Sequence, residues 1–309
     1  MKLNWLSSAL LSVALANWSA HAQQPAYPPN QGPAVLLDAK YRNLLSLRLR
    51  PSLIETFTTD GYRVIEREGE ITERSLRDVK IMVSALPVSA QNSLPTDLPP
   101  STEAELAAQI AAAWRLPTPS AYSASKVEAL VSWVNQGGSL LVITDHMPFP
   151  GAVQDLTSRF GFELANGHAL AIAEDRRANP DRFSRSDGSL ADHPITAGRS
   201  ATERIEAVET SGGAAFRVPA HGQSLMTFGS GYQQLRPKVA WQFTPDTPRE
   251  AIAGWSQGAV VQAGRGKVAV FTEAGFFMAP PPDEAASEAG RQNRQFVLNV
   301  AHWLSGLLK

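Results

Sequence analysis

Short apolar runs alternate with amphipathic patterns through the first half of the chain. The runs at 34–37, 62–65 and 79–85 favour strands, because each is brief, apolar and bounded by turn residues. A helical pattern fills the space between the first two runs and stops at Gly61. This β-α-β order predicts a parallel sheet covered by helices.

The periodicity is clearest after residue 122. Apolar residues at i, i+3, i+4 and i+7 predict a helix over 125–136, namely Val127, Leu130, Val131 and Val134. Ser125 and Glu128 have the spacing of a capping box at its start. A strand is predicted at 139–144 and a helix at 152–160, and a last helix is predicted over 291–308.

Beyond residue 161 the chain becomes rich in short β patterns. Strands are predicted at 169–173, 205–208, 239–243, 260–262 and 267–271. We therefore predict an α/β fold, a Rossmann-like (flavodoxin-like) three-layer sandwich with a mostly parallel central sheet and β-rich additions in the C-terminal half. Since no internal repeat or second linker is present, 34–309 is predicted to form one domain. A Pro- and Ala-rich segment with one helix is inserted at 86–122.

The N-terminus has the pattern of a secretory signal peptide. Lys2 precedes an apolar run at 9–16, and Ala20-His21-Ala22 fits the small-x-small cleavage site. We predict a signal peptide over 1–22, a flexible leader over 23–33, and a periplasmic or secreted mature protein. The alternative is an uncleaved segment as the only contact with a membrane, although its apolar run is short for a bilayer of roughly 30 Å.

Charge and cysteine content exclude several classes of protein. The 309 residues carry a formal net charge of −1 and no run of Lys and Arg, so no nucleic-acid partner is expected. The chain contains no cysteine, which excludes disulfides, thiolate metal sites and a cysteine nucleophile.

Titratable residues gather where predicted strands end. Asp38, Asp145 and Glu273 each follow an apolar strand, and His146 comes directly after Asp145. Because ligands bind outside the carboxyl ends of the strands in a doubly wound sheet, we predict that these four residues share one ligand-binding cleft. The alternative, that each acid caps a turn or a helix, stays open.

The remaining histidines carry less weight. His193 stands before a proline and His302 lies in the last helix, and both contexts favour a structural role. No role is predicted for His168 or His221. The serine-hydrolase elbow, the phosphate-binding loop and the zinc-protease helix motif are all absent from the sequence.

Four stretches of the sequence are considered together. They are VSWVNQGGSLLVITDHMPFPG, DGSLADHPITAG, GRGKVAVFTEAGFF and NRQFVLNVAHWL. Together they resemble a family of exported bacterial proteins with the DUF4350-like pattern. That family resembles a branch of the class I glutamine amidotransferase-like superfamily, and HPITAG is similar to a loop of its ThuA-like branch. The resemblance covers about residues 35–308, and it implies an amidotransferase-like α/β domain.

The sequence departs from a true amidotransferase at the residues of its chemistry. Thr144, Asp145 and His146 stand where the resemblance would place the nucleophilic cysteine, and Glu273 alone matches the rest of the triad. Since neither a carboxylate nor an imidazole replaces a thiolate in that chemistry, no glutaminase activity is expected. The family pattern favours histidines after the first strand, and the segment at 38–43 has none.

The leading hypothesis is an exported binding protein without a covalent nucleophile. Its expected ligand is a carbohydrate or another small polar molecule, because carboxylates accept hydrogen bonds from hydroxyls. Rings near the strand ends, such as Phe149, Phe276 and Phe277, would pack on the apolar faces of a sugar.

Two alternatives stay open. In a hydrolase, the strand-end acids would act as acid and base, or Asp145, His146 and Glu273 would hold a divalent cation. In a subunit of an envelope assembly, the segment at 86–122 would contact a partner. No cofactor is required by the sequence.

Overall fold

A nine-stranded sheet runs through the centre of the molecule. The structure is a computed structural model, and it describes residues 24–40, 44–89, 116–172, 181–278 and 287–309. The strand order is β2-β1-β3-β4-β14-β13-β9-β5, with β10 paired to β13. Its parallel part consists of β1 (Ala34–Asp38), β2 (Arg63–Arg67), β3 (Ile81–Ala85), β4 (Ser139–Ile143) and β14 (Gly266–Phe271).

The C-terminal half adds antiparallel strands. The central sheet continues with β13 (Ser256–Ala263), β10 (Gly222–Thr227), β9 (Phe216–Arg217) and β5 (Glu163–Leu164). Two small sheets are formed by β6 (His168–Ala171), β11 (Tyr232–Leu235) and β12 (Arg249–Ala251), and by β7 (Asp181–Ser184) and β8 (Ala207–Thr210). The predicted α/β fold, with a largely parallel sheet and β-rich additions, is thereby confirmed.

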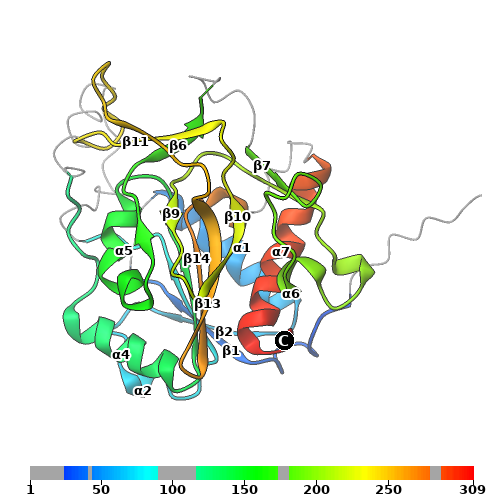
Figure 1. Cartoon of the computed structure of the whole chain (residues 1–309). Helices are drawn as coiled ribbons and strands as arrows, with labels where there is room; N and C mark the ends of the chain where they lie inside the picture. Colours follow the sequence, from blue (N-terminus) through cyan, green and yellow to red (C-terminus); the bar gives the residue numbers. More distant parts are fainter. Residues whose placement is uncertain (1–23, 41–43, 90–115, 173–180, 279–286) are drawn as a thin grey trace, which may run out of the picture.

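Helices cover both faces of the sheet (Figure 1). One face carries α1 (Leu44–Thr59) and α7 (Glu288–Ser305), with the short α6 (Pro194–Ala197) against α7. The other face carries α2 (Glu73–Leu76), α4 (Ala124–Asn135) and α5 (Phe149–Thr157). Short 3-10 turns are η2 (Ser158–Phe160), η3 (Ala201–Glu203) and η4 (Gly275–Phe277).

Burial on both faces explains why the parallel strands are continuously apolar. Successive side chains of a strand point to opposite faces, so both sets meet a helical layer here. In β1, Val35 and Leu37 pack on the side of α1 and α7, whereas Leu36 packs on the side of α4. Alternate residues of a strand therefore contact opposite helical layers.

Two details of the predicted elements are corrected. Helix α4 is capped by Ser123, whose hydroxyl accepts a hydrogen bond from the Lys126 amide, and not by Ser125. The segment at 239–243 is wrong as a strand, because Gln242 N–H bonds to the Val239 carbonyl in a turn. Trp241 in this turn has a φ of 64°, which a strand does not permit.

The leader at 23–33 is docked over its described residues and is not a free spacer. Tyr27 packs edge-on against Tyr62 with ring centroids 5.1 Å apart. Its backbone amide donates to the Asp60 carbonyl, and the Gly32 amide donates to the Gly61 carbonyl. These contacts hold the leader against the start of β2, so it adds to the core.

Two predicted segments fall outside the described residues. They are the signal peptide over 1–22 and the helix of the inserted segment, whose residues 90–115 are not described. Among the helices that are described, none combines the length and apolar character needed to cross a membrane.

Candidate functional site

The carboxyl ends of β4 and β14 bring Asp145 and Glu273 together. These strands are parallel neighbours whose register pairs Ile143 with Phe271. Asp145 and Glu273 each follow two residues later, so the strand alternation places them level with each other on one face of the sheet. The Asp145 carboxylate also accepts a hydrogen bond from the amide of Ala274, the residue after Glu273. We call Asp145 and Glu273 the acid pair.

Both carboxylates of the acid pair accept hydrogen bonds from backbone amides. Asp145 accepts from the amides of His146 (2.7 Å) and Ala274 (3.1 Å). Glu273 accepts from the amides of Gly275 (2.8 Å) and Phe276 (2.7 Å). These contacts join the end of β4 to the end of β14 and cap η4. The acids therefore have the capping role that was the alternative to a ligand-binding role.

The acid pair is an electrostatically unfavourable arrangement. Asp145 is 7% exposed and Glu273 is 4% exposed. Burial, together with the negative charges of Asp145 and Asp181, raises the pKa of Glu273 to about 8, although the two backbone amides act to lower it. Within the described chain, no Lys or Arg forms an ion pair with either carboxylate. Glu273 therefore keeps a proton at neutral pH.

His146, which follows Asp145, lies against a group of rings. We call His146, Phe149, His168, Trp241 and Phe243 the imidazole–aromatic cluster. The His146 ring lies 4.3 Å from Trp241, 5.9 Å from Phe149 and 6.1 Å from His168, measured between centroids. Trp241 also lies 5.0 Å from His168 and 5.9 Å from Phe243. Phe243 is 39% exposed, so the cluster reaches the surface.

Both ring nitrogens of His146 face oxygen atoms. Nδ1 lies 2.7 Å from the Met147 carbonyl oxygen, and a carbonyl only accepts, so Nδ1 carries a hydrogen. Nε2 lies 3.4 Å from Asp145 Oδ1. These two contacts orient the imidazole beside the Trp241 ring.

A pair of glycines lets the backbone pass between the cluster and the acid pair. Gly212 and Gly213 have φ values of 89° and 84°. A Cβ on Gly212 would lie 2.8 Å from His168 Cε1, and one on Gly213 would lie 2.9 Å from Glu273 Cβ. Only glycine meets both the left-handed backbone and the close approach.

Sequence analysis missed most of this cluster. His168 received no role, and Trp241 was placed in a strand. The available signal was the adjacent Gly212-Gly213, because two consecutive glycines often mark a turn with left-handed backbone. Of the other predicted rings, Phe149 joins the cluster, whereas Phe276 and Phe277 are buried and pack on Phe271.

A metal site at these residues gains no support. Among the described residues, no group of three or more His, Asp and Glu side chains is arranged to hold a metal ion. Both carboxylates of the acid pair already bind backbone amides.

Asp38 lies apart from the other three predicted site residues, which is a correction to the single cleft. Asp38 is level with Ser84 of β3, and Ser84 pairs with Val142 of β4, three residues before Asp145. In the part of the chain described here, no hydrogen bond or ion pair joins Asp38 to the other three. Strand β3 lies between Asp38 and the other three residues. The sequence could not show this, because it does not reveal the order and register of the strands.

Asp38 instead belongs to a buried polar network on the α4 face. The Lys126 ammonium lies 2.5 Å from Asp38 Oδ2 and 4.6 Å from the centre of the Tyr122 ring, and the Tyr122 hydroxyl bonds to Ser84. The side chains of Lys126 and Asp38 are 4% and 0% exposed. Burial lowers the pKa of Lys126, and the Asp38 carboxylate opposes that effect. The network fixes the first turn of α4 over β1 and β3.

The two histidines with expected structural roles have them. His193 caps α6, since its Nδ1 accepts from the Ile195 amide, and burial lowers its pKa to about 4. His302 is buried in α7 with Nε2 2.7 Å from Asp60 Oδ2.

Comparison with known proteins identifies the fold only. No family model matches the sequence, and no curated protein matches it either. The chain is similar to the mmIFT52 N-terminal domain, at 14% identity over 88% of this chain and 97% of that chain, with a TM-score of 0.56. At this identity the likeness shows a shared fold and no more.

Two further solved structures have lower TM-scores. The cytoplasmic protein STM1381 from Salmonella typhimurium LT2 matches at 11% identity, 88% and 98% coverage and a TM-score of 0.48. A putative ThuA-like protein from Bacteroides uniformis ATCC 8492 matches at 9% identity, 92% and 93% coverage and a TM-score of 0.47. The resemblance to the DUF4350-like pattern stays a prediction.

Proposed function

We propose that this chain is an exported, non-glutaminase binding protein on an amidotransferase-like scaffold, and that its ligand is a carbohydrate. The imidazole–aromatic cluster is the proposed binding site. The observation that carries the proposal is Trp241, a half-buried ring placed beside His146 by a backbone with a φ of 64°. A bulky residue holds such a backbone only where its surroundings demand it, and such positions concentrate at functional sites.

The chemistry of the cluster suits a sugar. Trp241 and Phe243 present apolar ring surface for the C–H face of a pyranose, and the His146 imidazole beside Trp241 supplies a polar group for a hydroxyl. No thiol is available for covalent chemistry, since the chain has no cysteine. The acid pair supports the site by fixing the β4 and β14 ends, and it does not contact the ligand.

A hydrolase is the second candidate, favoured by one observation. Glu273 is protonated near neutral pH, as a general acid must be. It ranks lower because Glu273 is 4% exposed and both of its oxygens accept backbone hydrogen bonds. Periplasmic or secreted localisation stays part of the proposal through the signal-peptide pattern, and partner binding by 86–122 stays an untested alternative.

Replacing Trp241 by alanine should lower the affinity for the sugar at least about tenfold, which corresponds to about 1.4 kcal/mol. The measurement is titration calorimetry with the best binder from a panel of monosaccharides and oligosaccharides. Leu307→Ala is a matched control, because Leu307 is 39% exposed and follows α7, whose Leu304 carbonyl accepts a hydrogen bond from Ser139 at the amino end of β4.

Two outcomes would contradict the proposal. One is that Trp241→Ala binds the sugar as tightly as the unmodified protein. The other is that no sugar of the panel binds at all while the protein is folded by circular dichroism.

A further inference from the structure

A pocket lies at the point where the order of the parallel strands reverses. From β1 the chain crosses through α1 to β2 on one side, and then returns to β3 on the other side. In doubly wound sheets, ligands bind outside the carboxyl ends of the strands at such a reversal. The pocket that occupies this place is small and partly open to solvent.

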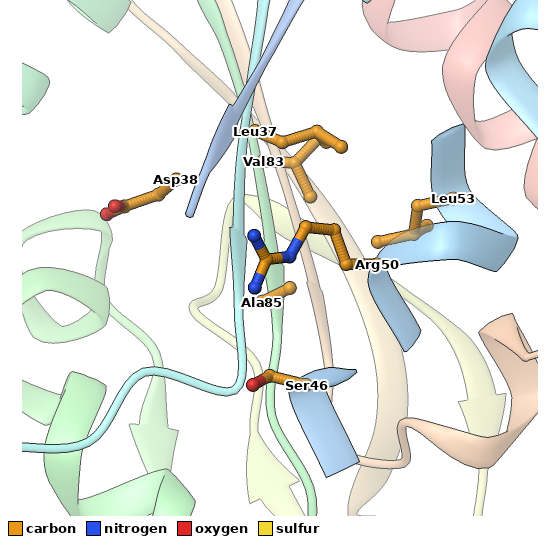
Figure 2. A pocket seen from close by; sticks show the side chains of 7 residues that line it. All are labelled: Leu37, Asp38, Ser46, Arg50, Leu53, Val83 and Ala85. Atoms are coloured by element: carbon orange, nitrogen blue, oxygen red, sulfur yellow. The ribbon is translucent and has the colours of Figure 1, made fainter. Parts of the chain in front are cut away.

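The pocket has apolar walls and two polar groups from one helix. Its lining consists of Leu37, Asp38, Ser46, Arg50, Leu53, Val83 and Ala85. Ser46, Arg50 and Leu53 are spaced i, i+4 and i+7, so α1 presents them on one face. Figure 2 shows the Arg50 guanidinium between α1 and the ends of β1 and β3, with the Ser46 hydroxyl below it.

The charge that faces the pocket is positive. Although Asp38 lines the pocket, its carboxylate points away from Arg50 in Figure 2 and is paired with Lys126 on the opposite face of the sheet. Among the described residues, the ion-pair partner of Arg50 is Glu66, at 3.5 Å. That pair is long, and the Glu66 side chain is 47% exposed. It therefore stabilises the guanidinium weakly.

Most of the donor capacity of Arg50 is thus left for another acceptor. A guanidinium has five N–H donors in a planar fork, which matches the two oxygens of a carboxylate or phosphate. The Arg50 side chain is 19% exposed, so much of its surroundings is protein rather than water. A charge-assisted, two-point hydrogen bond there is stronger than the long contact to Glu66.

We propose that this pocket binds a small oxyanion, a carboxylate or a phosphate, through the guanidinium of Arg50. The site lies at the ends of β1 and β3, whereas the imidazole–aromatic cluster lies after β4, on α5 and β6 and in the turn at 239–243, so either proposal can fail without the other.

The experiment uses the full chain, with acetate and inorganic phosphate as the two probes. Binding is measured by titration calorimetry and by the shift of the melting temperature, with chloride holding the ionic strength constant. Arg50→Gln should lower the affinity for the bound probe at least about tenfold. Arg48→Gln is the matched control, because Arg48 is exposed on the same helix two residues away.

A second variant has the opposite expected sign. Glu66→Gln removes the carboxylate that competes for Arg50, so it should raise the affinity up to about fivefold, the worth of an exposed ion pair. Binding of acetate alone assigns a carboxylate, and binding of phosphate alone assigns a phosphate. The inference is overturned if neither probe binds the unmodified protein, or if Arg50→Gln binds as well as Arg48→Gln while both are folded.

Discussion

Replacing Lys126 by methionine should lower the free energy of unfolding by about 3–5 kcal/mol. Methionine keeps most of the apolar length of the side chain but removes the ammonium 2.5 Å from Asp38 Oδ2. The Asp38 side chain has no exposed surface, so its charge would remain buried without a counterion. Urea denaturation at neutral pH measures the loss.

The matched control removes both charges together. A double variant, Lys126→Met with Asp38→Leu, leaves no buried charge unpaired, and apolar replacements of a buried ion pair are often neutral or stabilising. It should therefore recover most of the stability lost in Lys126→Met. A loss below about 1 kcal/mol in the single variant would show that Asp38 is solvated or neutral, since exposed pairs contribute only that much.

This network also shows why the site could be predicted only in part. The sequence showed that Asp38 ends a strand, and that is correct. Whether it meets Asp145 depends on the strand order and the register, which place it level with Ser84 and on the α4 face. Neither property leaves a local pattern in the chain, because apolar strands of a parallel sheet read alike on both faces.

The fold was more predictable than the site, because its elements do leave a local pattern in the sequence. Strands β1, β3, β4 and β14 are short, apolar and bounded by turn residues, and α4 has a clear helical stripe, so local pattern was sufficient. The segment at 239–243 is equally apolar, yet it turns at Trp241. Its flanking prolines, Pro237 and Pro245, were the local sign against a paired strand.

For the acid pair, the strand-end position could be predicted from the sequence, whereas the effect on stability follows from the structure. Between about pH 4.5, where Glu273 ordinarily titrates, and about pH 8, the folded protein holds a proton on this residue that the unfolded chain has released. The stability that Glu273 contributes is therefore complete below pH 4.5 and is lost as pH rises toward 8. For one proton the slope is about 1.4 kcal/mol per pH unit.

Replacing Glu273 by glutamine should remove this slope. At low pH the variant should be the less stable protein by about 1–3 kcal/mol, because an amide NH₂ cannot accept the hydrogen bond from Gly275 or Phe276 that a carboxyl oxygen accepts. Toward pH 8 the unmodified protein loses stability and the variant does not, so the two curves should converge or cross. Denaturation at a series of pH values measures both curves.

Asp145→Asn separates the two causes of the raised pKa of Glu273. Burial is the larger cause and stays in this variant, whereas the repulsion from the Asp145 charge is removed. The loss of stability should therefore still occur but should end at a lower pH than in the unmodified protein. If Glu273→Gln instead keeps the full slope, another titrating group causes it, and Glu273 does not hold its proton up to pH 8.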